Sequence, residues 1–233
     1  MSDSDDDGIE MLQYKVIVVG DGAVGKTSLI MRFCEDAFKQ SYKQTIGLDF
    51  FIKRLVLPGN VHTTLQIWDI GGQQIGGKML SNYIFGSHAV LFVYDVTSAE
   101  SFKNVEDWLD VVLQSCKNQE KMPYLGLVGN KMDLNHLRVV KAEKHSLLAV
   151  ENSMNAFFVS AKSGDKVNSL FVKVAADLAG VTLSKAELEV AENVTTATIV
   201  KHEVSAANEH SKIELKDTIK KEERAKEKDC VVS

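Results

Sequence analysis

The chain has 233 residues, of which 45% are hydrophobic and 25% are charged, and its formal net charge is -5. This composition is typical of one folded domain with a well-buried core, and it argues against nucleic-acid binding through a basic surface. No apolar run reaches the roughly 18 to 20 residues of a membrane-spanning helix, and the acidic start, MSDSDDDGIEM, is unlike a secretory signal.

The first predicted elements are a strand, a glycine loop and a helix. Residues 14–19 (YKVIVV) form a β-branched run, and residues 26–35 place apolar side chains on one side of a helix. Two extended segments, 49–57 and 61–69, flank the sequence PGN, whose proline and glycine favour a tight hairpin. This hairpin predicts the antiparallel edge of a sheet.

Strands and helices then alternate. Apolar strands are predicted at residues 89–94, 124–129 and 156–159, and helices at 101–114, 141–151 and 167–179. The alternation predicts an α/β fold with a mostly parallel sheet, one antiparallel edge strand and helices on both faces. In such a sheet, ligands bind beyond the carboxyl ends of the strands.

Composition divides the chain into four parts: an acidic, flexible N-terminus (1–12), a folded domain (13–180), a charged tail (181–229) and a final tetrapeptide (230–233). Residues 212–229 hold seven basic and six acidic residues. This mixture predicts a solvated helix or a flexible spacer, and no second folded domain.

Residues 20–27, GDGAVGKT, match the pattern G-x-x-x-x-G-K-[ST] and lie between the first strand and the first helix. In that context the pattern predicts a P-loop NTPase fold, because glycines permit close approach and successive N–H groups can surround a phosphate. Lys26 is predicted to bridge the β- and γ-phosphates, and the Thr27 hydroxyl to bind Mg²⁺. The predicted phosphate-binding residues are Gly22, Ala23, Val24, Gly25, Lys26, Thr27 and Ser28.

The sequence NKMD at 130–133 ends a predicted strand and points to guanine. The two oxygens of Asp133 can accept both the N1–H and the 2-amino hydrogens of guanine, whereas adenine has neither donor. Lys131 can lie across the base, and Asn130 can connect this loop to the phosphate loop. After the last strand comes Ser160-Ala161-Lys162, where the Ala161 N–H is predicted to meet the guanine O6.

These motifs resemble the Ras superfamily of small GTPases, from about residue 13 to residue 179. TIGLDF at 45–50 and LQIWD at 65–69 resemble the Rab family, and YKQTIGLDFF, LPGN, WDIGGQ and IGGKML resemble its divergent Rab twenty-eight branch. The resemblance implies a regulatory GTPase that binds GTP and GDP with Mg²⁺, hydrolyses GTP slowly and recruits effectors in vesicle and membrane traffic. It also implies two switch segments, 38–47 and 70–86.

The resemblance also implies roles for individual residues. Phe38 packs against the base and Tyr42 closes over the phosphates. Thr45 completes the Mg²⁺ coordination and Asp69 holds the ion through a water. Further along, Gly72 donates its N–H to the γ-phosphate, and Gln73 is the catalytic residue that orients the attacking water.

Two features depart from the usual Rab pattern. The segment Ile70-Gly71-Gly72-Gln73-Gln74 replaces the usual Thr-Ala-Gly-Gln-Glu, and QIGGKML follows it. Gly76 and Gly77 are expected to weaken the start of the second switch helix. The chain ends in a single-cysteine C-a-a-X sequence, CVVS, which predicts farnesylation of Cys230, and one lipid gives only reversible membrane binding.

The implied partners are an exchange factor, a GTPase-activating protein, effectors and a prenyl-binding carrier, with no nucleic acid and a monomeric state. The expected location is the cytosol and the cytoplasmic face of membranes, and the resemblance extends this to endosomes or the ciliary base. The alternative function is a GTP-binding interaction module with negligible hydrolysis. A P-loop kinase is disfavoured because no arginine-rich lid or acceptor site is evident.

Overall fold

The computed structural model describes residues 11–39, 41, 43–77 and 79–197. Their strands form one sheet of six, in the order β2-β3-β1-β4-β5-β6. The strands are β1 (Leu12–Val19), β2 (Leu48–Leu57), β3 (Val61–Ile70), β4 (Ala89–Asp95), β5 (Tyr124–Asn130) and β6 (Asn155–Phe158). Only the β2–β3 pair of this sheet is antiparallel, so the predicted fold class is confirmed.

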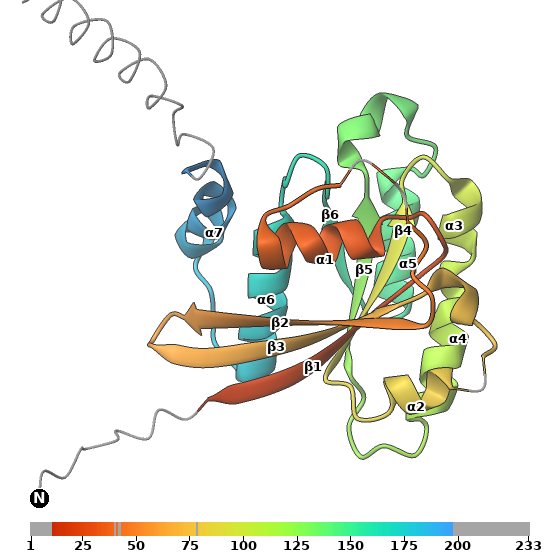
Figure 1. Cartoon of the computed structure of the whole chain (residues 1–233), viewed down its shortest axis with the longest axis horizontal. Coiled ribbons are helices and arrows are strands. Elements are labelled where there is room, and N and C mark those ends of the chain that lie inside the picture. The colour runs from red at the N-terminus through yellow and green to blue at the C-terminus, as the bar shows by residue number, and fades with distance from the viewer. Residues whose placement is uncertain (1–10, 40, 42, 78, 198–233) are drawn as a thin grey trace, which may run out of the picture. The chain divides into compact units, whose positions relative to one another are not determined.

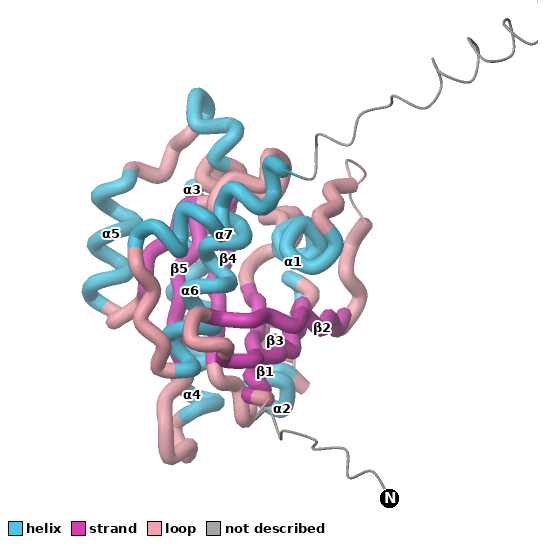
Figure 2. The backbone as a smooth tube through the Cα atoms, turned by 90° about the vertical axis from the view of Figure 1, so that its left-hand side faces the viewer, coloured by secondary structure: helices cyan, strands magenta, loops and turns pink. Residues whose placement is uncertain are grey.

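Helices cover both faces of the sheet (Figure 1). The helices that the structure describes are α1 (Lys26–Glu35), α2 (Leu80–Ile84), α3 (Ala99–Lys103), α4 (Val105–Cys116), α5 (Ala142–Glu151), α6 (Val167–Ala179) and α7 (Lys185–Ala197), with short 3-10 helices at Gly72–Gln74 (η1) and Met132–Leu137 (η2). Figure 2 shows the central strands enclosed by these helices. No helix among the described residues is both long and apolar enough to cross a membrane.

The apolar core has two parts, one on each face of the sheet. On one face, α1 and α6 pack together, and the rings of Phe33 and Phe171 stack with centroids 4.2 Å apart. On the other face, α2, α4 and α5 bury Trp108 and Leu148 against β4. Every residue of β4 is buried, which explains why this strand reads as a continuous apolar run.

The predicted helix at 101–114 is wrong in one respect, because the structure divides it at Asn104 into α3 and α4. Ser98 caps α3 by accepting a hydrogen bond from the Ser101 N–H.

In segment 70–86, the predicted second switch, α2 begins only at Leu80. Gly76, which precedes the helix, has a φ of 77°, a value that is unfavourable for residues other than glycine. The helical part of this segment is therefore only five residues long.

A helix, α7, lies within the region predicted as a tail. Its start carries a capping box in which the Ser184 hydroxyl and N–H each donate to Glu187 Oε2 at 2.7 Å. Just before it, Val181 and Leu183 pack against the core beneath α6. The remainder of the predicted tail, from residue 198, and the terminal tetrapeptide lie outside the described residues.

His145 is a fully buried polar side chain on α5. Its Nδ1 lies 2.9 Å from the Tyr94 hydroxyl, and its ring is tilted by 32° relative to that of Phe158, with centroids 4.2 Å apart. Burial lowers the pKa of His145 from 6.5 to about 4, and the nearby positive charge of Arg138 acts in the same direction. The folded state therefore holds this histidine in its neutral form.

The buried histidine predicts acid sensitivity. Its pKa is lower in the folded state, so stability is complete above about pH 6.5 and is lost as the pH falls toward 4. Between pH 7 and pH 5 the loss at this site is about 2 kcal/mol. Urea unfolding should show that the free energy of unfolding falls less between pH 7 and pH 5 for His145→Gln than for the parent. The exposed His136→Gln is the control, and an equal pH dependence in all three proteins would contradict the prediction.

Candidate functional site

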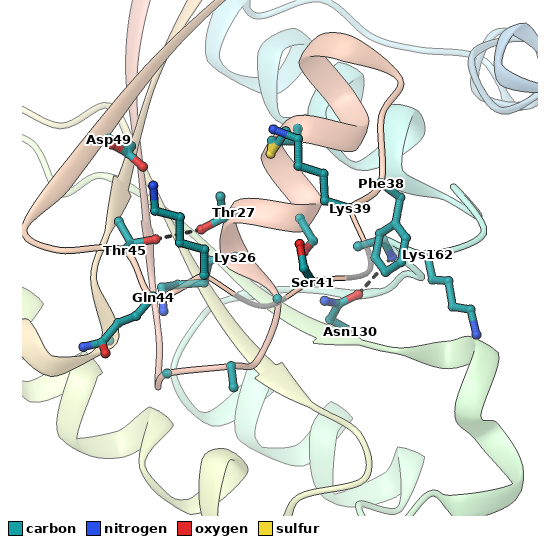
Figure 3. A pocket seen from close by; sticks show the side chains of 18 of the residues that line it. Lys26, Thr27, Phe38, Lys39, Ser41, Gln44, Thr45, Asp49, Asn130 and Lys162 are labelled. Carbon is teal, nitrogen blue, oxygen red and sulfur yellow. Dashed lines mark hydrogen bonds between the residues drawn. The ribbon is translucent and has the colours of Figure 1, made fainter.

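A cavity of about 900 Å³ opens beyond the carboxyl ends of the parallel strands. Segments that follow β1, β3, β5 and β6 line it, together with the segment between α1 and β2. In Figure 3, Lys26, Thr27 and Thr45 lie at one end of the cavity, and Phe38, Asn130 and Lys162 lie at the other. The structure thus brings together the motifs that the sequence separates by more than 100 residues.

The loop between β1 and α1 requires glycine at two positions. Gly20 has φ 135°, and a Cβ there would lie 2.1 Å from the Val93 carbonyl oxygen. Gly25 has φ 96°, and a Cβ there would lie 2.5 Å from Asn130 Nδ2. Both contacts are too short for any other residue, so the loop is held closely between neighbouring strands.

Lys26 is buried at the start of α1, and its ammonium group is already oriented. Nζ donates to the carbonyl oxygens of Gly20 and Asp21, each at 2.7 Å. Burial lowers the pKa of Lys26 to about 8, while the carboxylates of Asp69 and Asp21 partly oppose this shift. The Lys26 side chain therefore stays mostly charged at neutral pH, and two carbonyl groups of the β1–α1 loop fix the position of its ammonium group.

Three oxygen-bearing side chains meet next to Lys26. The Thr27 hydroxyl lies 2.9 Å from the Thr45 hydroxyl, a contact drawn in Figure 3. It also lies 2.5 Å from Asp69 Oδ2. Burial raises the pKa of Asp69, and the hydrogen bond from Thr27 works against that rise. Its second oxygen, Oδ1, is buried without a hydrogen-bond partner among the described residues.

This group fits a magnesium ion. Hydroxyl and carboxylate oxygens are the ligands that Mg²⁺ prefers, and an unpartnered buried carboxylate oxygen gains from a nearby cation or its water. Within the described ranges, no three His, Cys, Asp or Glu side chains cluster to hold a metal ion. A magnesium ion here would have the hydroxyls of Thr27 and Thr45 and the carboxylate of Asp69 as candidate ligands.

The consecutive glycines after β3 pack tightly against both neighbouring loops. A Cβ on Gly72 would lie 2.2 Å from the Gly22 nitrogen, and one on Gly71 would lie 2.6 Å from the Thr45 carbonyl oxygen. The Gly71 N–H also donates to the Gly47 carbonyl at 3.0 Å. Segments 38–47 and 70–86, predicted to be the switches, are thus in backbone contact, and the exposed Gln73 of the second segment lies at the edge of the cavity.

Asn130 connects three segments at the other end of the cavity. Its Nδ2 donates to the Val24 carbonyl at 2.9 Å, and its Oδ1 accepts the Ala161 N–H at 3.1 Å. That N–H, which was predicted to meet guanine O6, is therefore bonded within the protein in this structure. Ser160 donates to Asp133 Oδ1 at 2.7 Å, which fixes the orientation of that carboxylate.

Lys131 adopts a left-handed backbone conformation, with φ 70°, directly after β5. Its Nζ lies 2.7 Å from Asp95 Oδ2, at the end of β4. Burial raises the pKa of Asp95, but hydrogen bonds from Lys131 and Thr97 outweigh it and the net pKa is lowered. The ion pair holds the aliphatic stem of Lys131 next to the cavity that it lines.

The sequence reasoning missed three acidic residues near the cavity. Asp49 lines it directly, Asp95 orients Lys131, and Asp21 bonds to α4. Asp95 follows a predicted strand and could have been found by its position; Asp21 has no sequence signal for its side-chain partners. Tyr42 and Cys230 lie outside the described residues.

Comparison with known proteins identifies the family. A sequence model of the Ras family matches residues 15–179. The chain is 44% identical over 199 residues to the Ras-related protein Rab-28 of Caenorhabditis elegans, covering 85% of this chain and 80% of that protein. It is 40% identical over 164 residues to the Ras-related protein Rab-1 of Theileria parva and to that of Theileria annulata, covering 70% of this chain and 72% of each relative. The chain therefore belongs to the Ras family of small GTPases, within it to the Rab proteins, and it is a GTPase.

Proposed function

We propose that this GTPase is a switch for intracellular membrane traffic, which binds effectors in its GTP form and releases them after slow hydrolysis to GDP. The observation that carries nucleotide binding is the shared cavity, which Lys26 and Thr27 line at one end, with Asp69 behind Thr27, and Asp133 lines at the other. The likeness to Rab proteins supports the role in membrane traffic. A guanine nucleotide has a phosphate chain at one end and a base with two donors at the other. The cavity offers complementary groups to each.

The phosphates bind at the β1–α1 loop in this proposal. The Lys26 ammonium supplies positive charge, and the following amides lie at the N-terminus of α1. The proposed phosphate-binding residues are Gly22, Ala23, Val24, Gly25, Lys26, Thr27, Ser28, Tyr42, Thr45 and Gly72. Thr27, Thr45 and Asp69 would hold Mg²⁺ next to the phosphates, and the ion would supply positive charge to the phosphate oxygens.

The base binds at the β5 and β6 ends of the cavity. Asp133 accepts two hydrogen bonds from guanine, and its fixed orientation lowers the entropy lost on binding. Phe38 and the stem of Lys131 contact the base from its sides. The proposed base-binding residues are Phe38, Asn130, Lys131, Asp133, Ser160, Ala161 and Lys162.

Hydrolysis is the step at which the two candidate functions differ. We expect Gln73→Leu to lower the single-turnover rate of GTP hydrolysis at least tenfold, because the leucine cannot orient a water. GTP affinity should stay within a factor of three. Gln119→Leu, on the distant α4–β5 segment, is the control. A parent protein that hydrolyses no faster than free GTP would instead support an interaction module without turnover.

Effectors, exchange factors and activating proteins are proposed to bind near the switches. The outer face of β2 exposes Phe50, which packs edge-on against Trp68 with centroids 5.7 Å apart. In the first switch, Ile46 is 90% exposed. Exposed apolar side chains beside a nucleotide-dependent segment are a suitable surface for partners that distinguish the two states.

Membrane attachment is proposed through farnesylation of Cys230, with a prenyl-binding carrier returning the protein to the cytosol. One lipid gives marginal affinity, so the protein would exchange between the cytosol and the cytoplasmic face of membranes. Mass spectrometry of the C-terminal peptide tests the modification. An unmodified Cys230 in protein isolated from membranes would refute it.

A further inference from the structure

Asp21, the second residue of the phosphate loop, is tied to α4 by both oxygens of its side chain. Oδ2 accepts from Asn104 Nδ2 at 2.7 Å, and Oδ1 accepts from the indole Nε1 of Trp108 at 3.1 Å. Asn104 lies at the break between α3 and α4, and Trp108 is only 1% exposed. The two donors come from 83 and 87 residues further along the chain.

The backbone of Asp21 faces the groups proposed to bind phosphate. Its carbonyl oxygen accepts from Lys26 Nζ at 2.7 Å. A Cβ on Gly72 would lie 2.4 Å from its carbonyl carbon, so the second switch is in direct contact with this peptide unit. Asp21 therefore joins α4 on one side to Lys26 and Gly72 on the other.

We propose that Asp21, Asn104 and Trp108 form a clasp of positioning residues that holds the phosphate loop in its nucleotide-binding conformation. The clasp rests on the proposal that residues 20–27 bind the nucleotide phosphates. None of its three members lines the cavity, so they act through Lys26 and the loop backbone.

The helix that carries Trp108 is held firmly in the core. The buried side chains of α4 that pack beside β4 include Trp108, Leu109 and Val112. By contrast, the loop contains three glycines and has little intrinsic stiffness. A hydrogen bond from a neutral donor is stronger when its acceptor is a charged carboxylate. The two bonds to Asp21 can therefore restrict the conformations of the loop before the nucleotide binds. A preorganised loop loses less entropy on binding and releases its ligand more slowly.

The test is the dissociation rate of a fluorescent GDP analogue in the presence of Mg²⁺. Trp108→Phe keeps an aromatic side chain in the core, smaller than the indole, and removes the indole donor, and Asn104→Ala removes the other donor at a partly exposed position. Each is expected to speed release about tenfold. When Trp108→Phe or Asn104→Ala is added to Asp21→Ala, the rate of release should rise by no more than about twofold further, because the acceptor of both hydrogen bonds is already absent.

Val112→Ala is the matched control, since it weakens the same helix in the core without touching the loop. Equal acceleration by Val112→Ala would show a general loss of stability and would overturn the clasp. The chain has two tryptophans, so nitrogen-15 spectra give two indole signals. Asp21→Ala should shift that of Trp108 and leave that of Trp68 in place; an unmoved Trp108 signal would contradict the proposal.

The two proposals can fail separately. If the parent protein does not bind GDP, the nucleotide site itself is wrong. If the parent binds GDP but the clasp variants release it at the parental rate, only the clasp is wrong.

Discussion

The Lys26→Met variant is expected to lose affinity for both GDP and GTP by a factor of at least about 100. Methionine keeps the length of the buried stem but cannot donate to phosphate oxygens, and charge-assisted hydrogen bonds contribute about 1.5 to 3 kcal/mol each. The substitution also removes the contacts with the Gly20 and Asp21 carbonyls, which loosens the loop. Isothermal titration with each nucleotide measures the loss.

The matched control is Lys141→Met, which changes an exposed lysine at the start of α5. It should bind both nucleotides as the parent does. Nucleotide-free Lys26→Met should unfold at a lower urea concentration than the parent, because the Gly20 and Asp21 carbonyls lose their donor, so affinities are compared at a temperature where both proteins are folded. A Lys26→Met protein with GDP affinity within a factor of three of the parent would contradict the phosphate site.

The Asp133→Asn variant is expected to reverse base preference, losing GDP affinity by a factor of about 100 and gaining affinity for xanthosine diphosphate. The carboxylate accepts two hydrogens from guanine, whereas an asparagine can accept one and donate one. Xanthine has an oxygen where guanine has its 2-amino group, so it matches the new pair. Asparagine also keeps an oxygen for the Ser160 hydroxyl, which lies 2.7 Å from Asp133 Oδ1.

Competition between xanthosine diphosphate and a fluorescent GDP analogue measures the reversal. Asp165→Asn makes the same chemical change on the adjacent exposed loop and should leave the preference for guanine intact. An Asp133→Asn protein that still prefers GDP over xanthosine diphosphate would place the base elsewhere. Together with the lysine variant, this experiment tests the two ends of the cavity independently.

Much of the fold follows from local sequence patterns. Buried parallel strands require continuous apolar runs, and residues 89–94 show that pattern because helices cover both faces of β4. The α1 and α6 boundaries were predicted without error, since each helix follows a turn segment and has one apolar face. The break at Asn104 was missed although asparagine is a common residue at helix N-termini. Its side chain does not cap α4 and instead donates to Asp21, far away in the sequence.

Some features of the site could likewise be predicted from local sequence, and others could not. GDGAVGKT and NKMD indicate their chemistry directly, because loops that bind phosphate and guanine need particular backbone freedom and particular acceptors at fixed spacing. The contact of Gly71 with the Thr45 carbonyl has no local signal, since a glycine in a loop has many explanations. The ion pair between Lys131 and Asp95 joins the ends of two neighbouring strands, so the pairing has no local signal even though each residue could be placed at a strand end.

Residues close together in the chain were enough to predict the α/β class, the phosphate loop and the preference for guanine. The contacts that hold those groups in place are visible only in the folded chain: the proposed Asp21 clasp, the glycine contact between residues 38–47 and 70–86, and the hydroxyl pair beside Asp69. These interactions join residues that are far apart in the chain. Their energies depend on distance and burial, which a linear pattern does not contain.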